Sequence, residues 1–186
     1  MKKLPSTPVK TLVLCALFAA LTAVTAQISV PIGPVPICLA TFSVYLAGAV
    51  LGAAGGALSQ LVYLLLGAVS IPVFAGFSGG AAVLMGPTGG YLVGYIICAW
   101  LVGLFADRFG KKILPLVFGM IFGTAACYFL GTAWFMFSTH RGLAESLMLC
   151  VVPFLIGDTA KIVVASVLAP RLSHALSRVS TEAGAA

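Results

Sequence analysis

A run of 96 residues without Asp, Glu, Lys or Arg separates Lys10 from Asp107, and this run limits the possible folds more than any other feature. Soluble domains carry roughly 25% charged residues, whereas this chain of 186 residues has 8% and is 61% hydrophobic. An ordinary water-exposed surface cannot be built from such a run. The composition therefore predicts one all-α integral membrane domain over residues 1–186 and argues against a soluble enzyme.

Apolar windows divide the chain into six expected transmembrane helices, since each crossing needs about 20 mostly apolar residues. Their ranges are 11–30, 38–55, 57–71, 88–106, 112–134 and 146–169. The first window also has features of a signal peptide, with Lys2 and Lys3 before it and small residues near Ala26. We expect it to be retained as the first helix.

The positions of the basic residues predict the orientation, because cytoplasmic loops of membrane proteins are enriched in Lys and Arg. With the N- and C-termini in the cytoplasm, only Arg141 falls on the outer side. The residues on the cytoplasmic side are then Lys2, Lys3, Lys10, Arg108, Lys111, Lys112, Arg171 and Arg178. These small groups account for the net charge of +6 without a basic, aromatic-rich patch, so no nucleic-acid partner is expected.

Two unusual connectors fall on the predicted outer side. Residues 31–36 contain three prolines, which favour an extended segment. Residues 72–87 are too apolar for a solvated loop and too rich in Gly for a regular helix. Irregular backbone at membrane depth is tolerated where it is buried in protein or lines a cavity. The two connectors therefore predict a pocket that faces the outside.

Asp158 and Lys161 are the residues most indicative of function, since both fall inside the last predicted helix. A charge at the centre of a membrane costs about 2.5 to 3.5 kcal/mol. At positions i and i+3 the two side chains share a helix face, so they form either an ion pair that fixes helix packing or a site for a small polar ligand. One acid and one amine do not make a metal site or a proton relay. A small intramembrane enzyme that uses them as an acid–base pair is an alternative.

Other candidate residues surround this pair in the expected topology. Thr41, Tyr91 and Tyr95 lie beside the connectors, and the second connector adds Phe74 and Gly79. Small residues at four-residue spacing, which let helices approach closely, form an alanine stripe in the first helix and the glycine stripe Gly48, Gly52 and Gly56. The glycine stripe favours internal packing, with a channel or oligomeric scaffold as the alternative. The five cysteines are scattered singly, and we expect unpaired packing residues: Cys15, Cys38, Cys98, Cys127 and Cys150.

Several of these segments resemble the biotin-specific S component of energy-coupling-factor (ECF) vitamin transporters. The resemblance covers about residues 11–170 in order. It rests on the segments Ile28–Ile37, Tyr63–Gly67, Ile71–Gly76 and Gly86–Tyr91, with Asp158 and Lys161 in the last helix. It implies a six-helix protein of the bacterial cytoplasmic (inner) membrane that captures biotin from outside, with riboflavin or thiamine as alternative ligands.

The resemblance also implies partners and a binding site. Ala16, Ala20 and Ala23 would contact a transmembrane coupling subunit, and two ATPase subunits would power uptake. The chain has no P-loop of its own, and it is expected to be neither an enzyme nor a holder of a metal or a cofactor besides its ligand biotin. The implied substrate-binding residues are Asp158, Lys161, Tyr91, Tyr95, Thr41, Gly79 and Phe74. Whether Lys161 meets the ureido carbonyl or the carboxylate of biotin is left open by the sequence.

Overall fold

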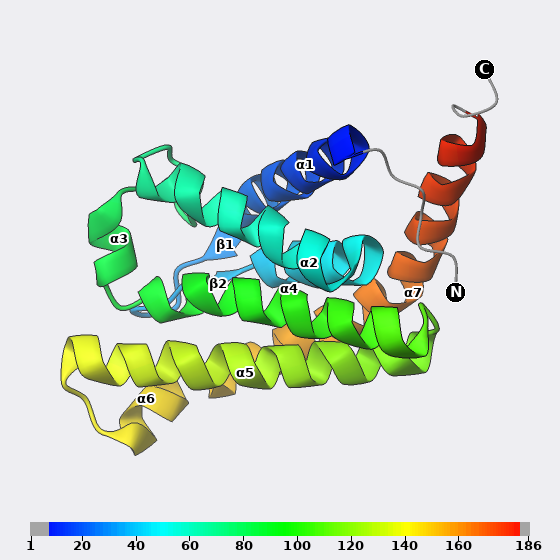
Figure 1. Cartoon of the computed structure of the whole chain (residues 1–186). Coiled ribbons are helices and arrows are strands. Elements are labelled where there is room, and N and C mark those ends of the chain that lie inside the picture. Colours follow the sequence, from blue (N-terminus) through cyan, green and yellow to red (C-terminus); the bar gives the residue numbers. More distant parts are fainter. Residues whose placement is uncertain (1–7, 183–186) are drawn as a thin grey trace.

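The computed structural model describes residues 8–182 and consists of helices with one short β-hairpin (Figure 1). The elements in order are α1 (Pro8–Gln27), β1 (Ser29–Val30), β2 (Ile37–Cys38), α2 (Ala40–Ala68), α3 (Ala81–Met85), α4 (Gly89–Phe109), α5 (Ile113–Thr139), α6 (Leu143–Cys150) and α7 (Val152–Glu182). The strands are antiparallel, with Ser29 opposite Cys38 and Val30 opposite Ile37. The three prolines thus lie in the loop that joins the two strands, over residues 31–36.

Five helices, α1, α2, α4, α5 and α7, are long and apolar enough to cross a membrane. Their outer faces remain apolar: Leu17, Phe129 and Ile156 are 58%, 75% and 84% exposed. A helix that is apolar on its exposed face as well as its buried face is suited to lipid, since water would disfavour such a surface. The prediction of an all-helical protein that passes through the membrane several times is confirmed at this level.

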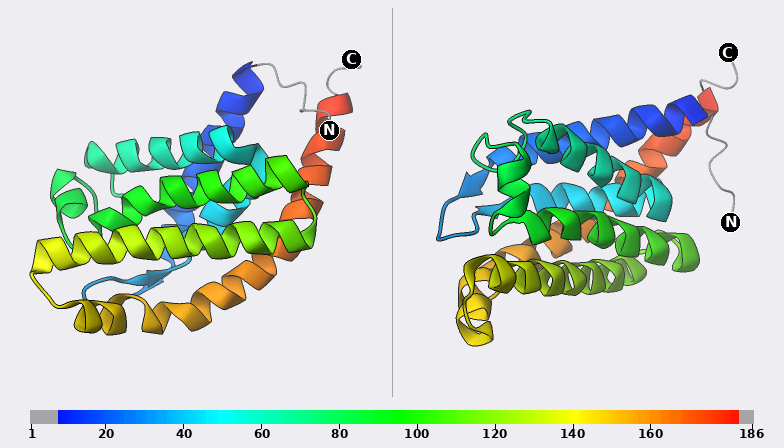
Figure 2. Two further views of the ribbon diagram at one scale, coloured as in Figure 1. Left: turned by 60° about the horizontal axis from the view of Figure 1, so that its bottom comes forward. Right: turned by 60° about the vertical axis from the view of Figure 1, so that its left-hand side comes forward.

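Helix α2 contains a sharp reversal, where the sequence predicted two separate spans at 38–55 and 57–71. Gly52 has φ 79° and ψ −177°, a conformation that favours glycine. Figures 1 and 2 show the two halves of α2 running back along each other. A Cβ atom on Gly56 would lie 2.7 Å from Gly48 Cα. The reversal therefore lies at Gly52, a few residues before the expected boundary, and the glycine stripe packs the two halves together as predicted.

Charged groups at the end of α4 and in the α4–α5 turn stabilise the reversal. The carboxylate of Asp107 accepts a hydrogen bond of 2.9 Å from the backbone N of Ala53, and Lys111 Nζ donates to Val50 O at 2.7 Å. Lys111 also donates to Ser173 Oγ at 2.9 Å, and its burial lowers its pKa. A helix that ends inside the protein leaves backbone N–H and C=O groups without partners. Asp107 and Lys111 supply partners on either side of Gly52, a role for which the sequence analysis had no indication.

Helix α4 lies at the centre of the bundle and approaches α2 and α5 at glycines. A Cβ atom on Gly103 would lie 2.3 Å from Ala53 N, and one on Gly94 would lie 2.8 Å from Cys127 Sγ. Any larger residue at these positions would push the helices apart. Close approach at small residues is the usual way in which membrane helices pack, because lipid gives little hydrophobic driving force between them.

The bundle has two chemically different ends, which are visible in both views of Figure 2. The β-hairpin, the α2–α4 connector and α6 lie at one end, and the start of α1, the reversal in α2, the α4–α5 turn and the end of α7 lie at the other. The second end carries most of the described basic residues: Lys10, Arg108, Lys111, Lys112 and Arg171. Arg141 belongs to the first end. Lys2, Lys3 and the side chain of Arg178, which also entered the prediction, lie outside the described residues.

We predict that Asp107→Ala lowers the free energy of unfolding by about 1 to 2 kcal/mol, the usual effect of losing a helix cap. The measurement is SDS-induced unfolding of the detergent-purified chain. Glu145→Ala is the matched control, because Glu145 pairs with Arg141 only at the surface, where such pairs contribute little. Equal losses of stability in the two variants would show that Asp107 has no special role at the reversal.

Candidate ligand-binding site

Asp158 and Lys161 form an ion pair inside the helix bundle. Lys161 Nζ lies 2.8 Å from Asp158 Oδ1, and the two side chains are 10% and 4% exposed, respectively. They are one turn apart on α7, so their spacing in the sequence already placed them on one face. The structure brings the predicted acid and amine together.

Three other elements contribute partners to this pair. Thr41 Oγ1, at the start of α2, donates to Asp158 Oδ1 at 3.1 Å and accepts from Lys161 Nζ at 2.9 Å. Lys161 Nζ also donates to the backbone carbonyl of Cys38 in β2 at 2.6 Å. The hydroxyl of Tyr128 in α5 donates to Asp158 Oδ2. All three N–H donors of the ammonium group are therefore used, and both carboxylate oxygens have partners.

This network explains how two charges can be buried inside the helix bundle. Removing one partner of a buried ion pair costs about 3 to 5 kcal/mol, because the other charge is left without compensation. Here the carboxylate and the ammonium compensate each other, while a threonine, a tyrosine and a backbone carbonyl satisfy the remaining positions. A ligand that binds to the pair must take the place of one of these partners or use a free lone pair of Asp158.

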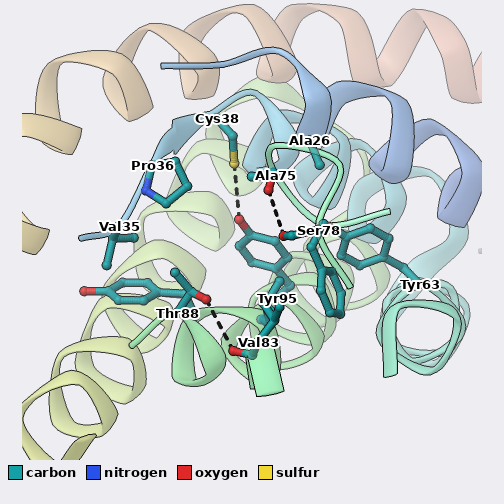
Figure 3. Close-up of a pocket in the computed structure, with 13 residues that line it drawn as sticks. Ala26, Val35, Pro36, Cys38, Tyr63, Ala75, Ser78, Val83, Thr88 and Tyr95 are labelled. Carbon is teal, nitrogen blue, oxygen red and sulfur yellow. Dashed lines mark hydrogen bonds between the residues drawn. The ribbon is translucent and has the colours of Figure 1, made fainter. Parts of the chain in front are cut away.

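Two adjoining cavities lie next to the ion pair. The smaller, of about 40 Å³, is lined by Asp158, Lys161, Thr41 and Tyr128 among others. The larger, of about 160 Å³, extends toward the α2–α4 connector (Figure 3). Five residues line both cavities: Val35, Pro36, Cys38, Tyr91 and Tyr95. The two cavities therefore form one site with a charged part and an aromatic part.

Aromatic rings form one wall of the larger cavity. The ring of Tyr63 meets Phe74 edge-on, with centroids 5.5 Å apart. Its plane is inclined by 29° to that of Tyr95, whose centroid lies 6.5 Å away. The Tyr95 hydroxyl lies 3.6 Å from Cys38 Sγ, and Figure 3 shows this pair pointing into the cavity. Gly67 determines the place of Phe74, since a Cβ atom there would lie 2.0 Å from the ring. Such a wall suits a flat or apolar part of a ligand.

Both unusual connectors line the site, as the sequence predicted. The β-hairpin contributes Val35, Pro36 and Cys38. The α2–α4 connector contributes side chains to the larger cavity only: Phe74, Ala75, Ser78, Val83 and Thr88. The two connectors lie at the same end of the bundle. Segments about 40 residues apart in the sequence thus close the site from one side.

Most of the residues implicated by the sequence lie at the site. Thr41, Tyr91, Tyr95 and Phe74 all line one or both cavities. Gly79 lines neither: a Cβ atom there would lie 2.5 Å from Ile71 O, so Gly79 packs against the connector's own backbone.

The alanine stripe of α1 lines neither cavity of the ligand site. Ala16 and Ala20 are exposed, whereas Ala23 is half-buried and packs against the core. The exposed small-residue face is therefore Ala16 and Ala20. Four of the five cysteines are buried, as expected of packing residues, and Cys38 is the half-buried one.

Tyr63, Tyr128 and the Cys38 carbonyl are parts of the site that the sequence analysis missed. A tyrosine in the middle of an apolar helix needs a partner for its hydroxyl, so the position of Tyr128 could have indicated a polar site. The Cys38 carbonyl could not have been predicted, because every residue has a backbone carbonyl. Among the described residues no three His, Cys, Asp or Glu side chains cluster as metal ligands.

Comparison with known proteins identifies the family. The model of the "BioY family" matches residues 1–178 of this chain. The "Probable biotin transporter BioY" of Pyrococcus horikoshii is 45% identical over 159 residues, which are 86% of this chain and 93% of that protein. The "Biotin transporter BioY" of Thermotoga maritima is 43% identical over 161 residues, 87% and 94% of the two chains. A crystal structure described as the S-component for biotin from an ECF-type ABC transporter is similar with a TM-score of 0.82 and 31% identity, over 90% of this chain and 94% of that one. With matches across nearly its whole length, this chain belongs to the BioY family.

Proposed function

We propose that this chain captures biotin and, as the substrate-specific subunit of an ATP-driven ECF transporter, delivers it across the cytoplasmic membrane of a bacterium. The observation that carries the proposal is the buried Asp158–Lys161 pair beside two adjoining cavities, which the two apolar connectors help to line. Relatives of this chain are named biotin transporters, and the similar crystal structure is an S-component for biotin. The BioY family consists of transporter components, so the chain is not an enzyme.

The chemistry of biotin matches the two parts of the site. Its ureido ring offers two N–H donors and one carbonyl acceptor, and its valerate tail ends in a carboxylate. Asp158 can accept from a ureido N–H, and Lys161 can donate to the adjacent carbonyl, since the two protein atoms are only 2.8 Å apart. A ligand carboxylate placed at Lys161 would instead lie next to the carboxylate of Asp158, where like charges repel. We therefore assign the ureido group to the ion pair.

Other parts of the proposal concern topology and partners. We place the basic end of the bundle in the cytoplasm, and with it both termini. We propose that the two halves of α2 cross the membrane separately. Together with α1, α4, α5 and α7 they make six passes. The exposed face of Ala16 and Ala20 on α1 is the proposed contact for the transmembrane coupling subunit, and ATP hydrolysis resides in two partner ATPases because this chain has no P-loop.

The first prediction concerns affinity. The detergent-purified chain is expected to bind biotin with a Kd near 1 nM, which corresponds to about 12 kcal/mol, and riboflavin far more weakly. Asp158→Asn is expected to raise the Kd for biotin about 100-fold, because a neutral amide replaces the charged acceptor of the ureido N–H, and hydrogen bonds to charged groups contribute about 1.5 to 3 kcal/mol.

Isothermal titration measures these affinities, and size-exclusion chromatography checks folding. Asp107→Asn is the matched control, since it makes the same chemical change at the other end of the bundle. Tighter binding of riboflavin than of biotin would reject the proposed ligand. Unchanged biotin binding in the Asp158 variant would reject the site.

A second prediction concerns Tyr128, whose hydroxyl donates to Asp158. Tyr128→Phe is expected to weaken biotin binding by about ten- to a hundredfold, because one hydrogen bond to a charged group contributes about 1.5 to 3 kcal/mol. Tyr45→Phe is the control: the Tyr45 hydroxyl is also buried, yet it bonds to Thr124 away from both cavities. Equal effects of the two changes would mean that Tyr128 acts only through general packing.

A third prediction tests the assignment of the ureido group. Biotinamide keeps the ureido ring but has a neutral amide in place of the carboxylate. It is expected to bind within about tenfold of biotin, and Lys161→Met is expected to weaken both ligands equally. Competition titration against labelled biotin gives these ratios. A variant that loses affinity for biotin alone would place the carboxylate at Lys161 instead.

A further inference from the structure

Gln27, the last residue of α1, ties this helix to the connector that covers the larger cavity. Its Nε2 atom lies 3.1 Å from Val73 O and 3.2 Å from Phe74 O, and also 3.1 Å from Ala23 O within α1. Its Oε1 atom accepts from Phe77 N at 2.8 Å. One side chain thus holds three backbone groups of a segment about 46 to 50 positions away. No signal in the sequence set Gln27 apart from other polar residues near helix ends.

The segment that Gln27 holds is part of the cavity wall, and we call residues 73–78 the roof segment. Phe74, Ala75 and Ser78 line the larger cavity. The roof segment has its own short hydrogen bonds, from Phe74 N to Ser78 O and from Ser78 N to Phe74 O. These bonds keep its shape, but they do not fasten it to another element. The bonds to Gln27 join it to α1.

The tip of the roof segment has little packing of its own. Gly76 and Phe77 have φ angles of 71° and 55°, as in a tight turn, and the Phe77 side chain is 72% exposed. The rest of the wall belongs to the β-hairpin and to α2, α4, α5 and α7, long helices whose displacement would break many contacts. The roof segment is short and is held by the packing of the Phe74 ring against Tyr63 and Gly67 of α2 and by hydrogen bonds. It can therefore move at a lower cost than these helices, and its position depends in part on the bonds of Gln27.

The two cavities are too small to hold a whole vitamin. Cavities that hold small organic molecules usually measure roughly 300 Å³ or more, while these measure about 160 and 40 Å³. A ligand of that size therefore fits only when part of the wall moves. Since the bonds of Gln27 oppose movement of the roof segment, they also oppose ligand release.

We propose that Gln27 is a positioning residue that fastens the roof segment to α1 beside the larger cavity and thereby slows ligand release. The identity of the ligand, biotin, rests on the function proposed above, whereas the fastening itself does not. Loss of the side-chain bonds raises the dissociation rate constant, because the segment that covers the bound ligand then moves away more readily.

The kinetic test compares Gln27→Met and Gln27→Glu with the unchanged chain. Met removes all the side-chain hydrogen bonds at similar size, and Glu keeps an acceptor for Phe77 N but has no donor for the two carbonyls. Dissociation of tritiated biotin from the detergent-purified full chain is expected to be about tenfold faster in both, the effect of one or two lost hydrogen bonds. Val24→Ala on the lipid-facing side of α1 is the control, since Val24 is 64% exposed.

A second readout needs no ligand. Cys38 is half-buried and lines both cavities, while Cys15, Cys98, Cys127 and Cys150 are buried. Figure 3 shows the Cys38 sulfur pointing toward the Tyr95 hydroxyl, and Ala75 and Ser78 of the roof segment line the same cavity. Alkylation of Cys38 by a maleimide in the ligand-free protein, followed by peptide mass spectrometry, is expected to be about tenfold faster in both Gln27 variants. Cys38→Ser identifies the labelled peptide.

The outcomes separate the two proposals. If the unchanged chain fails to bind biotin, the proposed function falls, and the alkylation rates alone still decide the role of Gln27. Unchanged alkylation in folded Gln27 variants overturns the inference. An equal increase in Val24→Ala also overturns it, because the effect would then come from a general loosening of α1.

Discussion

The mutual compensation of Asp158 and Lys161 is the interaction on which the site depends. Both charges lie inside an apolar bundle and would be costly alone. Thr41, Tyr128 and the Cys38 carbonyl complete their hydrogen bonds, so four different elements must meet at one place. This requirement couples the folding of the bundle to the formation of the site. The ion pair also offers donors and acceptors to a ligand, once a ligand group takes the place of one of its hydrogen-bond partners.

At the opposite end of the bundle, charged side chains likewise satisfy buried polar groups, which there belong to the backbone. Asp107 and Lys111 satisfy the backbone at the reversal of α2, and glycines let the two halves and α4 approach closely. Because the first half of α2 begins next to Thr41, its placement against α4 also positions one of the partners of the ion pair. Charged residues are rare in this chain, and at both ends of the bundle they satisfy groups that lipid cannot satisfy.

The walls of the site differ in how firmly they are held. Long helices carry the ion pair and the rings of Tyr63 and Tyr95, which keeps the geometry of these groups constant. The roof segment, by contrast, depends on backbone bonds within a short turn, on the packing of the Phe74 ring against α2 and on the side chain of Gln27. A recognition surface on long helices, together with a short wall segment held by few contacts, reconciles tight binding with release.

Much of this arrangement follows from local properties of the chain, and the remainder does not. The lack of charge over 96 residues specifies a helical membrane protein, and the spacing of Asp158 and Lys161 places them on one helix face, because both effects depend only on neighbouring residues. Proline and glycine content likewise marks the two connectors in advance. The reversal at Gly52, the partners Tyr128 and Cys38 O, the packing of Gly79 away from the cavity and the bonds of Gln27 depend on which distant segments meet. Hydroxyl, amide and carbonyl groups occur all along the chain, so only the packing of the helices could select the few that meet at the site.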